Sequence, residues 1–241
     1  MYDLSTVGFL TPRGIAVQLR IRDGTNDYNT ANSCLNEDEY ELRDLHLSGR
    51  ALDVGAYIGA VAIALAMDNP DLEVLALEAV PANAELTRQN VKLNGLDDWI
   101  TVIEGAACKP RQTTAQVHFG YRGSESALHH AFVGNSTLLR DTTAITDHDT
   151  VEIACRSLQS FGALDFLKID CEGCEWDFLR GPARKRGSPT SLDRVKRIHG
   201  EVHPTDGHDP LPDLEALLGK THQLSFSGPP AGPCGFVAVL R

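Results

Sequence analysis

The sequence predicts an α/β fold built around a mostly parallel β-sheet, and two separated segments carry the prediction. The first, residues 51–59, reads Ala-Leu-Asp-Val-Gly-Ala-Tyr-Ile-Gly and leads into the apolar stretch 60–67. A second apolar run, 74–77, ends in Glu78, so the order is strand, glycine turn, helix, strand, acid. This order is typical of a nucleotide-binding βαβ unit. The second segment, residues 166–170, is an apolar run closed by an acid, as expected for a buried parallel strand.

The N-terminal residues predict a strand, a turn and a helix. Residues 15–21 alternate as a strand, and Asp23-Gly24 is a turn signal, so residues 1–30 are expected to form a hairpin or a substrate-side cap. Residues 36–47 are predicted to be a helix, because Asn36 is a good N-cap and acidic residues follow in the first turn.

Two helices are predicted around the βαβ unit. The helix over 59–67 is apolar almost all round, so we expect it to be buried against the sheet. The next helix begins at Pro81, which suits a first helical turn, and Gly95 stops it.

The rest of the chain predicts further strands and a long loop. Residues 114–121 alternate as an antiparallel strand that pairs with 151–155, and the polar stretch 122–150 between them is expected to be a mobile loop of the kind that forms lids. The other predicted elements are a strand over 100–103, a helix over 175–180 ended by Gly181-Pro182, and strands over 195–202, 222–226 and 235–240.

No linker or internal repeat divides the chain, so residues 1–241 are interpreted as a single domain. Within it, 1–35 is expected to be an N-terminal substrate-side extension, 50–202 the cofactor-binding core, and 114–155 an insertion of strands and loop. The acceptor pocket is expected to involve 1–35 and 122–150.

Charge and composition exclude several partners. The net charge of −11 argues against a nucleic-acid polymer, which needs a basic surface. No apolar stretch approaches the length of a membrane span, and the N-terminus lacks the features of a signal peptide, so a cytoplasmic protein that does not bind membranes is expected. Cys171 and Cys174 have the spacing of a redox or zinc pair, but no second pair accompanies them. We interpret both as small apolar fillers.

Asp53 indicates which nucleotide the βαβ unit would bind. Tyr57 stands where a dinucleotide fold needs its second glycine, and a carboxylate at the turn would repel a diphosphate. The same carboxylate would attract S-adenosylmethionine (SAM), which carries a sulfonium and an ammonium and no phosphate. Glu78 would then accept hydrogen bonds from the ribose hydroxyls. The alternative is an ordinary α/β unit in which the glycine only turns the chain.

Both segments resemble the FkbM family of SAM-dependent methyltransferases. The first reads Asp53-Val-Gly-Ala-Tyr-Ile-Gly59 where the family has Asp-Val-Gly-Ala-Asn-Ile-Gly, and the second contains Leu-Lys-Ile-Asp-Cys-Glu-Gly-Cys-Glu over 167–175, where the family has Val and Ala at the cysteines. Ala79 also replaces a usual proline. The resemblance covers residues 50–202.

The resemblance implies a Rossmann-like class I methyltransferase fold with a seven-stranded sheet and helices on both faces. It implies methyl transfer from SAM to a hydroxyl of a small molecule, such as a sugar or polyketide in natural product biosynthesis. The expected SAM-binding residues are Asp53, Gly55, Ala56, Tyr57, Gly59, Glu78, Ala79, Gly105 and Ala106.

The acceptor side is expected beyond the carboxyl ends of the later strands. The candidates there are Asp170, Glu172, Glu201 and His203, with Asp170 as the main polar group and His203 as the general base. Glu172 and Glu175 could instead cap the helix that follows. Asp170, Glu172 and Glu201 could also gather around Mg²⁺, so the sequence leaves a metal open.

Three other functions stay open at this stage. An N-methyltransferase acting on an amine would need less help from a base. A NAD-dependent oxidoreductase is disfavoured by Asp53 and by the broken glycine pattern. A non-catalytic SAM-binding protein is disfavoured by Asp170 and Glu201. Neither the acceptor nor the oligomeric state follows from the sequence.

Overall fold

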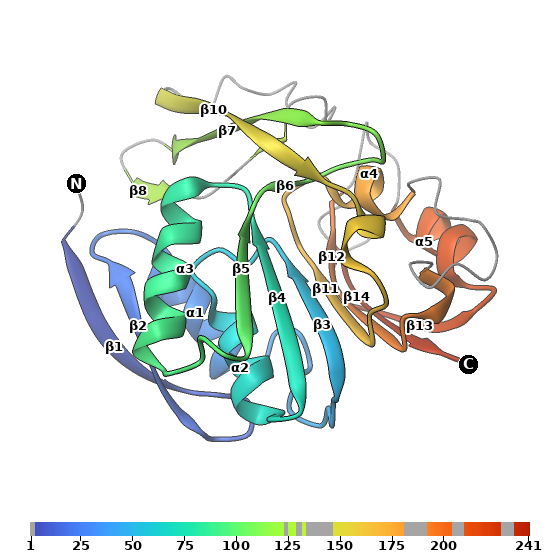
Figure 1. Ribbon diagram of the computed structural model, residues 1–241, viewed down its shortest axis with the longest axis horizontal. Helices are drawn as coiled ribbons and strands as arrows, with labels where there is room; N and C mark the ends of the chain where they lie inside the picture. Colours follow the sequence, from blue (N-terminus) through green and yellow to red (C-terminus); the bar gives the residue numbers. More distant parts are fainter. Residues whose placement is uncertain are drawn as a thin grey trace.

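The computed structural model describes residues 3–122, 125–128, 132–133, 147–180, 192–203, 210–227 and 234–241. Its centre is a seven-stranded sheet in which five neighbouring strands run parallel and two at one edge pair antiparallel (Figure 1). This sheet confirms the predicted fold class. Its strands, in spatial order, are β13 (His222–Ser227), β14 (Cys234–Leu240), β12 (Arg197–Val202), β11 (Phe166–Ile169), β3 (Gly49–Val54), β4 (Leu72–Glu78) and β5 (Ile100–Glu104).

Helices cover both faces of this sheet, and two hydrophobic clusters fill the space beneath them. In β3, Ala51 joins one cluster and Leu52 joins the other, because successive side chains of a strand point to opposite faces. The first cluster lies under α1 (Asp27–Leu35), α2 (Ala60–Asp68) and α3 (Pro81–Leu93), and the second under α4 (Glu175–Leu179) and α5 (Pro210–Leu218). The helices predicted from 59 and from Pro81 are confirmed as α2 and α3.

A hairpin, one of the two forms expected for 1–30, is present as β1 (Leu4–Leu10) and β2 (Ala16–Arg22), but its turn lies over 11–15, and Asp23-Gly24 follows β2. Two asparagine side chains at the C-terminal end of α3 form hydrogen bonds with backbone groups along the edge of β2, as the backbone of a neighbouring strand would. Asn90 accepts from the Arg20 N–H at 2.7 Å and donates to the Arg20 carbonyl at 3.2 Å. Asn94 does the same with Gln18 at 3.0 and 2.7 Å. These bonds fix the hairpin on α3, because they satisfy the backbone groups of its exposed edge.

The helix predicted over 36–47 is wrong. The helix in this part of the chain is α1, which ends at Leu35, and the residues after it form turns. Asp38 and Glu41 have positive φ angles, and the Asp38 carboxylate accepts from the N–H groups of Leu42 and Arg43. The acidic residue expected to start a helix therefore stabilises a turn instead, which short acidic side chains do readily. A buried ion pair between Arg22 and Asp27 holds the start of α1.

The insertion forms a second sheet at the carboxyl ends of the parallel strands (Figure 1). Its long strands pair antiparallel, which confirms the predicted pairing of 114–121 with 151–155. The loop predicted over 122–150 is wrong where the structure describes it, because Arg122 and residues 125–128, 132–133 and 147–150 are in strands. The other residues of the predicted loop lie outside the described ranges. The strands are β6 (Ala106–Ala107), β7 (Thr114–Arg122), β8 (Glu125–Leu128), β9 (Phe132–Val133) and β10 (Asp147–Arg156).

Two disulfides join cysteines of this fold. Cys108 pairs with Cys155, and Cys171 pairs with Cys174, so the interpretation of Cys171 and Cys174 as apolar fillers is wrong. Disulfides persist mostly in oxidising compartments, which weighs against the cytoplasmic location expected from the sequence. That location stays a prediction. No helix in the described ranges is long and apolar enough to cross a bilayer.

The two disulfides are expected to stabilise the fold unequally. Cross-linking stabilises by closing a loop in the unfolded chain, and the sequence separations are 47 for Cys108–Cys155 and 3 for Cys171–Cys174. Replacing both cysteines of the first pair by alanine should lower the free energy of unfolding by about 4 kcal/mol, against about 2 kcal/mol for the second. Urea unfolding of the two double variants under oxidising conditions measures this. Equal losses, or the reverse order, would contradict it.

Candidate functional site

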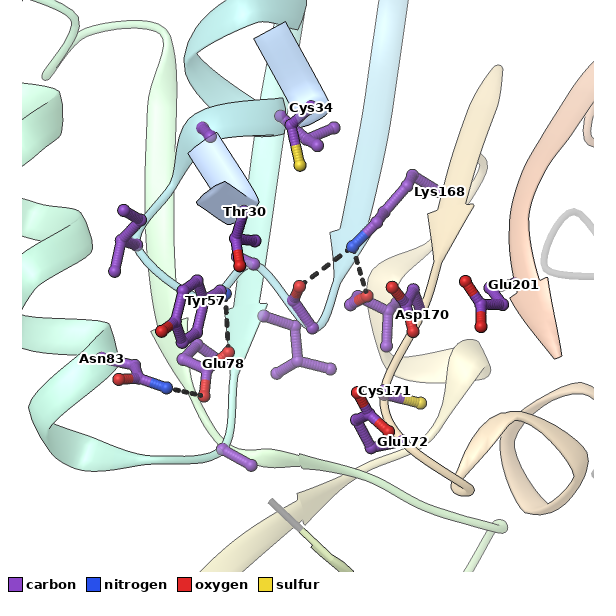
Figure 2. A pocket seen from close by; sticks show the side chains of 18 of the residues that line it. Thr30, Cys34, Tyr57, Glu78, Asn83, Lys168, Asp170, Cys171, Glu172 and Glu201 are labelled. Atoms are coloured by element: carbon purple, nitrogen blue, oxygen red, sulfur yellow. Dashed lines mark hydrogen bonds between the residues drawn. The ribbon is translucent and has the colours of Figure 1, made fainter. Parts of the chain in front are cut away.

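A cavity of about 380 Å³ lies beyond the carboxyl ends of β3, β4, β5 and β11. This is the position where open α/β sheets bind ligands, and the volume is in the range of small-molecule sites. Figure 2 shows Tyr57, Glu78 and Asn83 at one end of the cavity, and Asp170, Glu172 and Glu201 at the other. Residues of α1, including Thr30 and Cys34, form a further wall.

The glycine turn after β3 forms the floor of the cavity, and its conformation depends on Gly55. Gly55 has φ +76°, and a Cβ atom placed on it would lie 1.8 Å from the backbone carbonyl oxygen of Asp170. Any side chain would therefore collide with the loop after β11. Tyr57 also has a positive φ, of 53°, a conformation that asparagine tolerates better than tyrosine. The Tyr57 hydroxyl donates to Asp27, which holds the ring in place.

Glu78 is buried, lines the cavity and is held by its neighbours. Its carboxylate accepts from the N–H groups of Tyr57 and Val80, both at 2.8 Å, and from the Asn83 amide at 3.4 Å. Burial raises the pKa of Glu78, and the two backbone donors oppose that rise. The donors fix the carboxylate at the end of β4, and its two oxygens together still have acceptor capacity for a ligand hydroxyl.

Asp53 does not line the cavity. Its side chain is fully buried, and Oδ1 lies 3.2 Å from Nζ of Lys168 on the neighbouring strand. Lys168 also donates to the carbonyls of Val54 and Gly55, at 3.3 and 3.0 Å. The neighbouring Asp53 and Asp170 carboxylates outweigh burial and raise the pKa of Lys168, so it stays charged. The structure therefore gives Asp53 an ion pair with the lysine that holds the glycine turn, and a direct contact of Asp53 with SAM stays a prediction.

Three carboxylates line the opposite end of the cavity. Asp170 Oδ2 accepts from the Tyr40 hydroxyl at 2.7 Å, and burial raises the pKa of Asp170, with Glu172 adding to the rise and Lys168 opposing it. Burial and the charge of Asp170 raise the pKa of Glu201 to about 7. A carboxyl group with that pKa exchanges protons near neutral pH.

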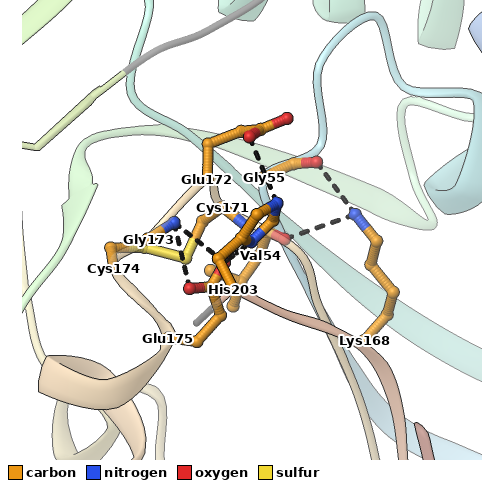
Figure 3. Close-up of a disulfide and its surroundings, with 9 residues drawn as sticks. All are labelled: Val54, Gly55, Lys168, Cys171, Glu172, Gly173, Cys174, Glu175 and His203. Carbon is orange, nitrogen blue, oxygen red and sulfur yellow. Dashed lines mark hydrogen bonds and ion pairs between the residues drawn. A yellow bond between two sulfur atoms is a disulfide. The ribbon is translucent and has the colours of Figure 1, made fainter. Parts of the chain in front are cut away.

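The contacts of His203 disfavour the role of general base predicted from the sequence. Its Nε2 lies 3.2 Å from Glu172 and its Nδ1 lies 3.1 Å from Glu175 (Figure 3). These carboxylates outweigh burial and raise the pKa of His203 to about 11, so the ring is a cation at neutral pH. His203 is also absent from the cavity wall.

Glu175 stabilises the turn before α4. Its buried carboxylate accepts from the N–H groups of Cys171 and Gly173, and the N-cap of α4 has no side-chain hydrogen bond, so the structure does not show the helix cap that one of the sequence alternatives held. Ligand atoms of Asp170, Glu175 and His203 lie within 4.8 Å of one another. This set does not fit Mg²⁺, which prefers oxygen ligands, because His203 is protonated and Glu175 is already bonded to backbone. The cluster is better described as an ion-pair network.

The structure thus brings most of the predicted residues to one cavity. The predicted residues in its wall are Gly55, Ala56, Tyr57, Glu78, Ala79, Gly105, Asp170, Glu172 and Glu201. Asp53, Gly59, Ala106 and His203 are outside it. Sequence reasoning missed Tyr40, Lys168 and Asn83, as well as the residues of α1. For Lys168 a signal existed, since a lysine inside the apolar run 166–169 requires a buried partner.

Comparison with known protein families identifies this architecture. A family model described as "Methyltransferase FkbM domain" matches residues 53–224. The chain belongs to this family. The match includes Glu78, Asp170 and Glu201, so these residues of the cavity wall belong to the FkbM domain.

One curated protein and two solved structures are also similar to this FkbM domain. The O-methyltransferase imqG of Aspergillus flavus is 40% identical over 57 residues, which are 24% of this chain and 23% of that protein, so the match spans about a quarter of the relative. TYW2 of P. horikoshii, solved in complex with MeSAdo, is 11% identical with a TM-score of 0.51, covering 100% of this chain and 72% of that one. The precorrin-6y C5,15-methyltransferase of Geobacter metallireducens GS-15 is 13% identical, with a TM-score of 0.47 and coverages of 85% and 87%.

Proposed function

We propose that this FkbM domain transfers the methyl group of SAM to a hydroxyl group of a small molecule. Family membership supports methyl transfer, and the printed activity of the imqG relative supports oxygen as the acceptor atom. The observation that carries the proposal is the cavity itself, which has a buried acceptor carboxylate at one end and a carboxyl group with a pKa of about 7 at the other.

The first end of the cavity fits the nucleoside part of SAM. Glu78 would accept from the ribose hydroxyls, since its carboxylate is already oriented by Tyr57 and Val80. Gly55, Ala56 and Tyr57 would form the floor, and Gly105 the wall beside the adenine. SAM supplies a methyl group on a sulfonium, which is a reactive donor without further activation.

The other end of the cavity fits the acceptor. In this proposal Glu201 accepts the hydroxyl proton as the oxygen attacks, because a base works best when its pKa is near the working pH. Asp170, held by the Tyr40 hydroxyl, positions the acceptor and keeps the pKa of Glu201 raised through its negative charge. The surrounding residues hold the acceptor in line with the methyl group and exclude water.

N-methylation of an amine is the second candidate, and the carboxylates at the acceptor end favour it because they attract a protonated amine. A protonated amine cannot attack the methyl group until a base removes its proton. Glu201 would serve either acceptor, so the product distinguishes them. Nuclear magnetic resonance of the methylated product reports whether the new carbon is bonded to oxygen or nitrogen.

Thermal unfolding with ligands tests the cofactor. SAM or S-adenosylhomocysteine at about 100 times its dissociation constant should stabilise the protein by about 2.7 kcal/mol and raise the melting temperature by about 5–10 °C, whereas NAD should not. Glu78→Ala should weaken SAM binding about 10-fold to 100-fold, because it removes charge-assisted hydrogen bonds. Glu85→Ala, an exposed change on α3, is the control. Stabilisation by NAD alone would overturn the proposal.

A further inference from the structure

A second cavity of about 210 Å³ adjoins the first. Glu39, Tyr40 and Glu201 line both cavities, so the two share a wall. The second cavity reaches from this shared wall along β12 and β14, where His199 and Phe236 line it. A molecule with its reacting group in the first cavity could therefore extend into the second.

His199 lines the second cavity and carries a ring nitrogen that has no hydrogen-bond partner in the described part of the chain. Its ring is 1% exposed and packs on Phe166, with ring centroids 5.1 Å apart, so its orientation is fixed. Nδ1 lies 2.7 Å from the Tyr40 carbonyl and must donate to it, because a carbonyl only accepts. Burial lowers the pKa of His199, so the ring is neutral and Nε2 carries a lone pair. Nε2 is buried and has no partner among the described atoms. A buried acceptor without a donor is costly, which indicates a ligand that donates.

The walls of the second cavity also carry negative charge. Glu39, Glu41 and Glu201 contribute carboxylates, and no described residue of this wall is lysine or arginine. His203 lies 3.7 Å from Glu201 and also pairs with Glu172 and Glu175, and Lys168 pairs with Asp53, so Glu39 and Glu41 are the carboxylates of this wall on which the attraction of a cation depends. A group placed here would meet several carboxylates and one neutral nitrogen lone pair.

We propose that the second cavity binds a nitrogen cation, a protonated amine or guanidinium, that belongs to the same acceptor molecule whose hydroxyl enters the main cavity. Such a group donates hydrogen bonds to His199 Nε2 and is attracted by Glu39 and Glu41. The acceptor is then an amino alcohol in the broad sense, a class that includes amino sugars. This inference rests on the proposed function, because it assigns the hydroxyl of that acceptor to the main cavity.

Matched probes test this directly. Linear amino alcohols with a chain of about three to six carbons, and the diols of equal length, are titrated by calorimetry into the full chain saturated with S-adenosylhomocysteine. At least one amino alcohol should bind about 10-fold or more tighter than its diol, because only the amine carries a charge. In Glu41→Gln, which changes a carboxylate that lines the second cavity and not the main one, this preference should fall about threefold or more, while the affinity for S-adenosylhomocysteine is unchanged.

Two further variants test whether the preference for the amino alcohol depends on residues of the second cavity. Asp44→Asn removes a carboxylate from the same segment that lines neither cavity, and it should keep the full preference. His199→Phe keeps a ring but removes the acceptor nitrogen, so it should also lower the preference. Equal binding of amino alcohol and diol, no binding of either, or an unchanged preference in Glu41→Gln would overturn the inference. Failure to bind S-adenosylhomocysteine at all would instead overturn the proposed function.

Discussion

Lys168→Met is expected to lower the free energy of unfolding by about 3–5 kcal/mol. Lys168 is the buried partner of Asp53, with 3.2 Å between Nζ and Oδ1, and Asp53 is fully buried. Removing the lysine leaves the Asp53 carboxylate without a counter-charge inside the sheet. The variant also loses the two hydrogen bonds to the carbonyls of Val54 and Gly55, so the glycine turn should loosen and SAM affinity should fall.

Two controls make this a test of the buried pair. Lys196 makes an ion pair with Asp165 at the surface, and Lys196→Met should cost less than about 1 kcal/mol, because water screens exposed charges. Adding Asp53→Asn to Lys168→Met should recover part of the loss, since it removes the stranded charge. Chemical denaturation of the three variants measures these differences. Similar losses in Lys168→Met and Lys196→Met would contradict the assignment.

Glu201→Gln is expected to lower kcat about 10²-fold to 10⁴-fold while leaving SAM affinity unchanged. In the proposed mechanism Glu201 must be deprotonated to accept the hydroxyl proton, so kcat of the unmodified chain should rise with pH through about 7. Glutamine cannot accept this proton, so the residual activity should lose that rise. The measurement is transfer of radiolabelled methyl from SAM into an acceptor found in a metabolite extract, followed across pH.

Asp170→Asn provides the matched change. It removes the negative charge that keeps the pKa of Glu201 high, so the rise in kcat should move to lower pH, in addition to slower transfer. A purely structural role for Asp170 would slow the reaction without moving the profile. A profile that stays at the same pH in Asp170→Asn, or persists in Glu201→Gln, would remove these residues from the proposed roles.

The sequence predicted the central sheet because its signals are local. Apolar runs such as 74–77 and 166–169 are long enough to be buried strands, and Pro81 and Gly95 mark the two ends of α3. The helix over 36–47 failed for the opposite reason. Its acidic residues suit both a helix start and a turn, and contacts with distant parts of the chain decide between them.

The site was predicted in position but not in its charge pairing. Glu78, Asp170 and Glu201 lie at or directly after the carboxyl ends of strands, so topology brings them to one cavity. The role of Asp53 depends on Lys168 in the neighbouring strand, and a single sequence does not show which strands are neighbours. The state of His203 depends in the same way on Glu172 and Glu175, whose distances only the folded chain sets. Charge was therefore visible in the sequence, whereas its compensation was not.

The close approach of Gly55 to the Asp170 carbonyl limits how the acceptor specificity of this methyltransferase can change. With no room for even a methyl group, the main chains after β3 and β11 rest directly on each other. In the proposed function, the separation of the donor and acceptor subsites would therefore be set by two backbones in contact, independently of any rotamer. Substitutions in the outer walls, such as α1 or the segment bearing Glu39, are then expected to change which acceptor fits without changing the spacing of the two subsites.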